Sequence, residues 1–157
     1  MAVIEDHADW TGIQLTSIDV GARHKKKRNL IFRDIAYATM GEVRLARLLA
    51  EQGIPFTPNV LVTLHTLGDK PKDYVPDFIL NGMPYLWEGK ELIHGFEAKG
   101  VPRNGFFAPK ALARVEALQR ERNIVIKLIS DREIIHYFEK SGRLGRSCLP
   151  LRPLVDE

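Results

Sequence analysis

The run IVIKLIS at 124–130 constrains the fold more than any other segment of the sequence. It is too short and too rich in β-branched residues for a helix, so it predicts a buried strand. A helical pattern with an apolar stripe precedes it at 108–123. Another helix is expected after it, capped by Asp131 and ended by Gly142. A buried strand between two helices requires a sheet with helices packed against it.

The upstream part of the chain supplies the other elements. Apolar residues at helical spacing predict a helix from Ile35 to Gln52, ended by Gly53. Branched residues then predict three strands, at 59–67, 74–80 and 92–100. The expected order, α-β-β-β-α-β-α, indicates an α/β fold with a mixed central sheet flanked by helices.

The length of 157 residues corresponds to a single domain. Hydrophobic residues make up 45% and charged residues 27%, which excludes a disordered or fibrous chain. We expect the domain to span 1–157, with a lead-in at 1–34, a core at about 35–130 and an extended tail at 143–157.

Three features indicate the compartment. The single cysteine, Cys148, excludes a disulfide framework or a thiolate zinc site within the chain and fits a reducing environment. The apolar runs are too short to span a membrane. The N-terminal stretch MAVIEDHADW carries acids where a signal peptide would carry bases. We therefore expect a soluble cytoplasmic domain.

The formal net charge of +3 conceals a strongly basic strip at 22–33. This strip contains no acid and six of the 23 lysines and arginines, namely Arg23, Lys25, Lys26, Lys27, Arg28 and Arg33. Without those six, 17 bases stand against 20 acids, a remainder of −3. Localised basicity is typical of a phosphate-contacting surface. A solvated basic arm without a partner is the alternative.

Charged residues also lie inside predicted strands. Asp77 stands between apolar neighbours in VPDFIL, and Glu97 and Lys99 are two apart in GFEAKG, so both leave the strand on one face. Burying carboxylates is costly unless they pair or coordinate a metal. Magnesium takes hard oxygen ligands and needs only one or two carboxylates when a substrate phosphate completes its shell. A lysine beside them can orient an attacking water and offset charge in the transition state.

These residues resemble the PD-(D/E)xK nuclease superfamily, which has the restriction-endonuclease-like fold. The matching residues are Pro76-Asp77 and Glu97-Ala98-Lys99, and the family's αβββαβ core matches the predicted order over about 35–130. The resemblance, nearest to transposon-end or very-short-patch endonucleases, implies a deoxyribonuclease dependent on magnesium or manganese. It implies that Asp77 and Glu97 are metal ligands and that Lys99 is the catalytic base or an electrostatic stabiliser.

Glu42 is a fourth candidate. Many members of the superfamily carry a glutamate on the first helix that joins the metal shell, and Glu42 stands at the corresponding place. Leu45, Ala46 and Leu49 follow at helical spacing, which puts Glu42 on the apolar face. The alternative is a capping box, in which Thr39 and Glu42 satisfy the start of the helix.

A second E-x-K motif, Glu88-Gly89-Lys90, lies closer to Asp77 along the chain. Glycine weakens a strand interior, and the surrounding residues are typical of a turn. We therefore prefer Glu97 and Lys99 to Glu88 and Lys90 as the motif.

Other residues carry weaker signals. Lys110 and Arg114, four apart on the later helix, can both contact a phosphate, although a solvated helix face is an equal alternative. The five histidines show no metal-ligand spacing, and only His94, three residues before Glu97, stands near the motif.

The sequence thus predicts a magnesium-dependent endonuclease acting on DNA, with a homodimer or a protein partner supplying specificity. The alternatives are a nucleic-acid-binding or assembly subunit that keeps the fold without turnover, and an ion-pair group that only stabilises the sheet.

Overall fold

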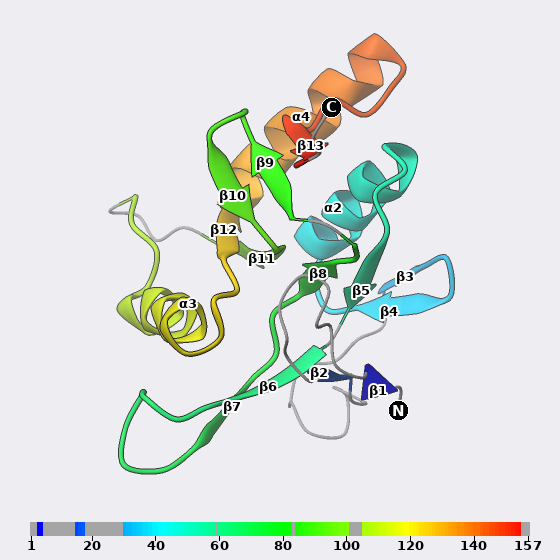
Figure 1. Cartoon of the computed structure of the whole chain (residues 1–157). Helices are drawn as coiled ribbons and strands as arrows, with labels where there is room; N and C mark the ends of the chain where they lie inside the picture. The colour runs from blue at the N-terminus through cyan, green and yellow to red at the C-terminus, as the bar shows by residue number, and fades with distance from the viewer. Residues whose placement is uncertain are drawn as a thin grey trace.

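The computed structural model describes residues 3–4, 15–17, 30–58, 60–82, 84–100 and 105–154. Its central sheet is mixed, as the sequence predicts (Figure 1). Strand β11 pairs in parallel with β12 and antiparallel with β8, and β8 pairs antiparallel with β5. The four strands, in sheet order, are β12 (Ile126–Ser130), β11 (Gly95–Lys99), β8 (Phe78–Leu80) and β5 (Phe56–Pro58).

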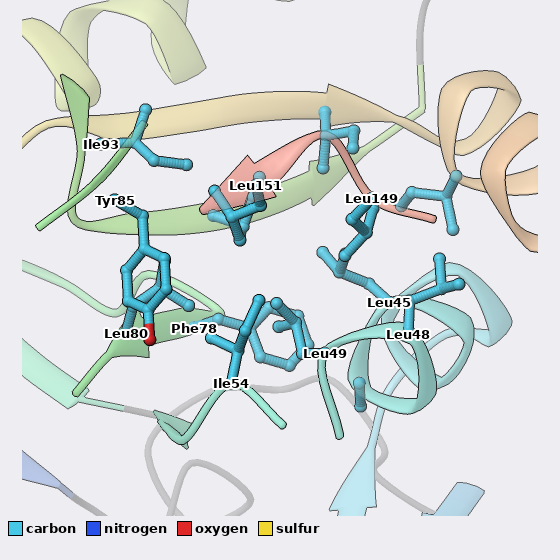
Figure 2. Close-up of a cluster of buried hydrophobic side chains, with 14 of the residues drawn as sticks. Leu45, Leu48, Leu49, Ile54, Phe78, Leu80, Tyr85, Ile93, Leu149 and Leu151 are labelled. Carbon is cyan, nitrogen blue, oxygen red and sulfur yellow. The ribbon is translucent and has the colours of Figure 1, made fainter. Parts of the chain in front are cut away.

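Helices cover both faces of this sheet. The side chains of β8 alternate between two apolar clusters, one on each face. Phe78 and Leu80 belong to the cluster beneath α2 (Met40–Glu51) and α4 (Asp131–Leu144), and Ile79 belongs to the cluster beneath α3 (Pro109–Arg122). Figure 2 shows the first cluster, where α2 directs its leucines toward Phe78 and the C-terminal segment. No helix in the described ranges is long and apolar enough to cross a bilayer.

Three smaller β structures surround the central sheet. The first has the order β1-β2-β6-β7, the second has the order β10-β9-β13, and the third is the hairpin of β3 and β4. The strands are β1 (Val3–Ile4), β2 (Leu15–Ser17), β3 (Leu30–Phe32), β4 (Ile35–Tyr37), β6 (Val60–Leu64), β7 (Lys72–Tyr74), β9 (Tyr85–Trp87), β10 (Glu91–Ile93) and β13 (Leu151–Pro153).

The first predicted helix begins five residues later than expected. Ile35–Tyr37 is strand β4, and α2 starts at Met40. The chain reverses at Arg33 and Asp34, both at positive φ, so β3 and β4 form a tight hairpin. Thr39 is extended and accepts a hydrogen bond from the Glu42 N–H, which sets the start of the helix.

The predicted strands are also shorter than expected. The run 74–80 divides into the end of β7 and β8, because Pro76 lacks the N–H that a continuous ladder requires. In the run 59–67 the strand ends at Leu64, because the Glu121 carboxylate accepts hydrogen bonds from the backbone N–H groups of His65 and Thr66. The run 92–100 divides at His94 into β10 and β11.

The last helix and the tail differ in detail from the prediction. Ser130, not Asp131, caps α4, in a capping box with Glu133. The helix continues past Gly142 to Leu144 and ends at Gly145, which has a positive φ. The tail therefore starts later than residue 143, and part of it is strand β13, paired with β9.

Candidate metal and nucleic-acid site

Two acids meet where β8 begins beside β11. Phe78 pairs with Phe96 and Ile79 with Gly95, and extending this antiparallel register by one residue places Asp77 opposite Glu97. Side chains at opposite positions share a face of the sheet, with Cβ atoms about 4.5–5.5 Å apart. Residues twenty positions apart in the sequence are thereby brought together on the face that α3 covers.

Asp77 is 9% exposed and is anchored to the neighbouring strand. Its Oδ2 accepts a hydrogen bond of 2.9 Å from the N–H of Ala98. The Asp77 side chain thus accepts a backbone hydrogen bond from β11 just beyond the last residue pair between β8 and β11. This hydrogen bond fixes the Asp77 carboxylate against the backbone of Ala98, between Glu97 and Lys99 in the chain.

Glu97 and Lys99 lie on the same face, as their spacing predicts. Lys99 Nζ is 3.4 Å from Glu97 Oε2, and the lysine side chain is 30% exposed whereas the glutamate side chain is buried. Glu97 Oε2 has no hydrogen-bond partner among the described residues. Lys99 Nζ offsets the charge of this carboxylate, and a divalent cation or its water would supply the further contact that the buried oxygen lacks.

The donor set fits magnesium or manganese, because both ions accept carboxylate oxygens and retain waters for a phosphate to replace. Asp77 and Glu97 would hold the ion. Within the described ranges, however, no three acids, histidines or cysteines are grouped closely enough to hold a metal by themselves. Asp77 and Glu97 are the two acids that the sheet register places opposite each other, and a metal held by them would take its other ligands from water or substrate.

Glu42 is buried on the apolar face of α2, as its helical spacing predicts. It also takes part in the cap: Thr39 Oγ1 accepts from the Glu42 N–H and donates to Glu42 Oε2, both at 3.1 Å. The start of α2 lies close to the end of β11. A Cβ at Gly41 would collide with Asp131 Oδ1, and a Cβ at Gly100 would lie 3.9 Å from Asp131 Oδ2.

Tyr74, which no sequence pattern marks, lies in the apolar cluster beneath α3, on the face of the sheet that carries the acids. It is buried at the end of β7, and its hydroxyl has no hydrogen-bond partner among the described residues. Burial raises its pKa most, followed by the charge of Glu97 and its capacity to accept a hydrogen bond, and then by the charge of Asp77. The position of Tyr74 depends on the pairing of β6 with β7, so no local pattern marks it.

Helix α3 brings a positive charge to the same region. The charge of Arg114 lowers the Tyr74 pKa, against the other influences, so the guanidinium lies within electrostatic range of the phenol. Arg114 is half-buried, and Lys110, one turn earlier, is exposed. Both predicted phosphate contacts lie on α3, which covers the face of the sheet that carries Asp77 and Glu97.

The second E-x-K motif belongs to a different sheet. Glu88 and Gly89, both at positive φ, form the turn between β9 and β10. Glu88 and Lys90 are exposed. The turn that the sequence predicts is present.

His94 has a clear structural role. It is buried, and its Nδ1 accepts a hydrogen bond of 2.9 Å from the Val125 N–H. Its backbone N–H also donates to the Val125 carbonyl at 2.7 Å. Burial lowers the His94 pKa, which favours the neutral ring that can accept this bond. His94 therefore ties the start of β11 to the approach to β12.

Most of the basic strip lies outside the described residues: Arg23, Lys25, Lys26, Lys27 and Arg28. Arg33 is described and exposed in the β3–β4 turn, with its guanidinium 5.3 Å from the centre of the Phe32 ring.

No protein-family model, curated protein sequence or solved structure matches this chain.

Proposed function

We propose that this chain is a metal-dependent deoxyribonuclease with a restriction-endonuclease-like core. One observation carries the proposal: Asp77, Glu97 and Lys99 share one face of the central sheet, where the buried Glu97 carboxylate pairs with Lys99 and its Oε2 has no hydrogen-bond partner among the described residues. Stability alone does not explain this arrangement well, because well-packed apolar residues stabilise a sheet at least as effectively as buried charges.

In this mechanism each side chain has a distinct role. Asp77 and Glu97 hold magnesium or manganese, which when bound lowers the pKa of a water and offsets charge on the phosphoryl group. The Lys99 ammonium, at the exposed rim, donates a hydrogen bond to the attacking water and orients it toward the phosphorus. Arg114 contacts a non-bridging oxygen of the scissile phosphate. Lys110 and the basic strip contact neighbouring phosphates.

The direct test is cleavage of plasmid, linear duplex and single-stranded DNA, and of RNA, with magnesium or manganese. Asp77→Asn and Lys99→Ala should each reduce cleavage by about 10²–10³-fold, because each removes charge stabilisation in the transition state. Lys90→Ala, which changes the lysine of the exposed motif, is the matched control and should cut normally. Wild-type rates for Asp77→Asn and Lys99→Ala would refute the proposed site.

One observation favours a second candidate, a nucleic-acid-binding subunit without turnover. Glu42 accepts a hydrogen bond from Thr39 Oγ1, which gives this acid a capping role that needs no metal. Such a subunit would bind DNA in a salt-sensitive, metal-independent way, and Lys99→Ala would not change its affinity. A nuclease that requires a homodimer or a protein partner would instead be inactive alone and regain metal-dependent cleavage when the partner is added.

A further inference from the structure

A pocket of about 340 Å³ lies where the β3–β4 hairpin meets the end of α2 and the start of β5 (Figure 1). Its walls are mainly apolar, and three aromatic side chains contribute to them: Phe32, Tyr37 and Phe56. Among the described residues that line it, Arg33 is the only charged one. Ligand sites commonly combine apolar and aromatic walls with few polar groups, in volumes of about 300–1,000 Å³. The pocket therefore has the size and lining of a site for a small, largely apolar group.

Arg33 places a positive charge on the aromatic wall. It is exposed in the β3–β4 turn, with its guanidinium 5.3 Å from the centre of the Phe32 ring, and it is the last base of the strip 22–33. A guanidinium stacked on a ring can still donate hydrogen bonds to a phosphate. No described atom lies within 4 Å of the place that a Cβ at Gly53 would occupy, so the pocket is open there. An aromatic wall beside a cation is complementary to a nucleotide, which carries a flat base and a phosphate.

The pocket is separate from the proposed metal site. Phe32 and Phe56 pack against the cluster beneath α2 and α4, whereas Asp77 and Glu97 lie on the face of the sheet that α3 covers. A base in this pocket would therefore not compete with the metal or with the scissile phosphate.

We propose that the pocket binds an unpaired base of a DNA strand, stacked against Phe32 and Phe56, with the adjoining phosphate held by Arg33. This inference rests on the DNA binding in the proposed function, and it specifies the substrate class: a single strand, or a duplex with an extruded base. Stacking tolerates any sequence, because every base has a flat face. A base stacked on an aromatic side chain commonly raises affinity by about tenfold or more.

The experiment measures binding of the full chain to two single strands of equal length by fluorescence anisotropy, with and without manganese. One strand is thymidine throughout, and the other consists of tetrahydrofuran abasic units, which keep the phosphates and lack the bases. We expect the wild type to bind the thymidine strand about tenfold more tightly.

Two variants should abolish this preference and keep the affinity for the abasic strand. Phe32→Ala removes an aromatic wall, and Ala50→Leu fills the pocket from α2 while leaving the core side chains intact. Thermal melting checks the folding of both, and Ala50→Leu carries the test if Phe32→Ala is unfolded. Ile31→Ala is the matched control, because Ile31 is 72% exposed on the same hairpin and does not line the pocket.

Equal affinity of the wild type for the two strands, or an undiminished preference in Ala50→Leu, would overturn the base site and leave DNA binding and cleavage standing. Failure to bind either strand and duplex DNA would overturn the inference together with the proposed DNA binding. A preference for bases that Ala50→Leu abolishes, in a protein that does not cleave DNA, would support the base site and contradict the nuclease.

Discussion

The shared face of Glu97 and Lys99 follows from the two-residue period of a strand, so the sequence predicts it directly. The burial of Glu42 follows from helical spacing in the same way. The hydrogen bond from the Ala98 N–H to Asp77 could not be predicted in this way. It depends on pairing between segments distant in the sequence, which local periodicity does not encode.

His94 makes stability depend on pH. Burial lowers the pKa of His94 in the folded state, so the imidazole binds a proton more readily in the unfolded chain. The free energy of unfolding therefore decreases as pH falls below about 6.5. Above that pH the contribution is fully present, and protonation would also abolish the bond that Nδ1 accepts from Val125.

The melting temperature of the wild type should therefore fall between pH 7 and pH 5 by more than that of His94→Asn. The asparagine has a carbonyl acceptor that does not titrate in this range. The exposed His65 and His136 are common to both proteins and cancel in the comparison. Parallel pH profiles would show that His94 is not the titrating group.

The elements were predicted where periodicity is strong and missed where a reversal breaks it. Helices α3 and α4 and strand β12 fall close to their expected ranges. The β3–β4 hairpin was missed because Arg33 and Asp34 adopt positive φ without the Asn-Gly or Asp-Gly pair that usually marks such a turn. The division around Pro76 was missed because the flanking residues are apolar on both sides.

The contact between β11 and β8 depends on Gly95. A Cβ there would collide with the carbonyl oxygen of Phe78 and approach Ile126 Cδ1 to 2.9 Å. Gly95→Ala should separate the strands that bring Asp77 beside Glu97, and lower the free energy of unfolding by about 3 kcal/mol or more.

Gly142→Ala is the matched control, because it lies in α4 with nothing within 4 Å of an added Cβ. It should raise stability by about 0.5–1 kcal/mol. Urea unfolding curves of the three proteins measure both effects. Equal stability of Gly95→Ala and the wild type would contradict the close pairing of β8 and β11.

At the scale of the whole molecule, the distribution of charge matters more than its sum. The +3 total combines a strip of six bases with acids such as Asp77 and Glu97, which a bound cation would neutralise. If the proposed function is right, metal binding would remove negative charge at Asp77 and Glu97, which would favour contact with a phosphate backbone.

Replacing Lys25, Lys26 and Lys27 by alanine should weaken DNA binding and flatten its dependence on salt. Each lost phosphate contact lowers the slope of log affinity against log salt concentration by about 0.9. Affinity measured across a salt series checks this, with Lys70→Ala and Lys72→Ala, exposed in and beside the β6–β7 loop, as the control pair. An unchanged slope in the triple variant would show that the strip is a solvated arm without a role in binding.

In the proposed function the buried Glu97 carboxylate on β11, not the exposed Glu88 carboxylate in the β9–β10 turn, holds the metal. The most direct measurement is the manganese-dependent cleavage rate of plasmid DNA by Glu97→Gln and by Glu88→Gln, which make the same chemical change in the two E-x-K motifs. We predict loss of cleavage in Glu97→Gln and a wild-type rate in Glu88→Gln. Wild-type cleavage by Glu97→Gln, with activity lost in Glu88→Gln, would contradict the assignment.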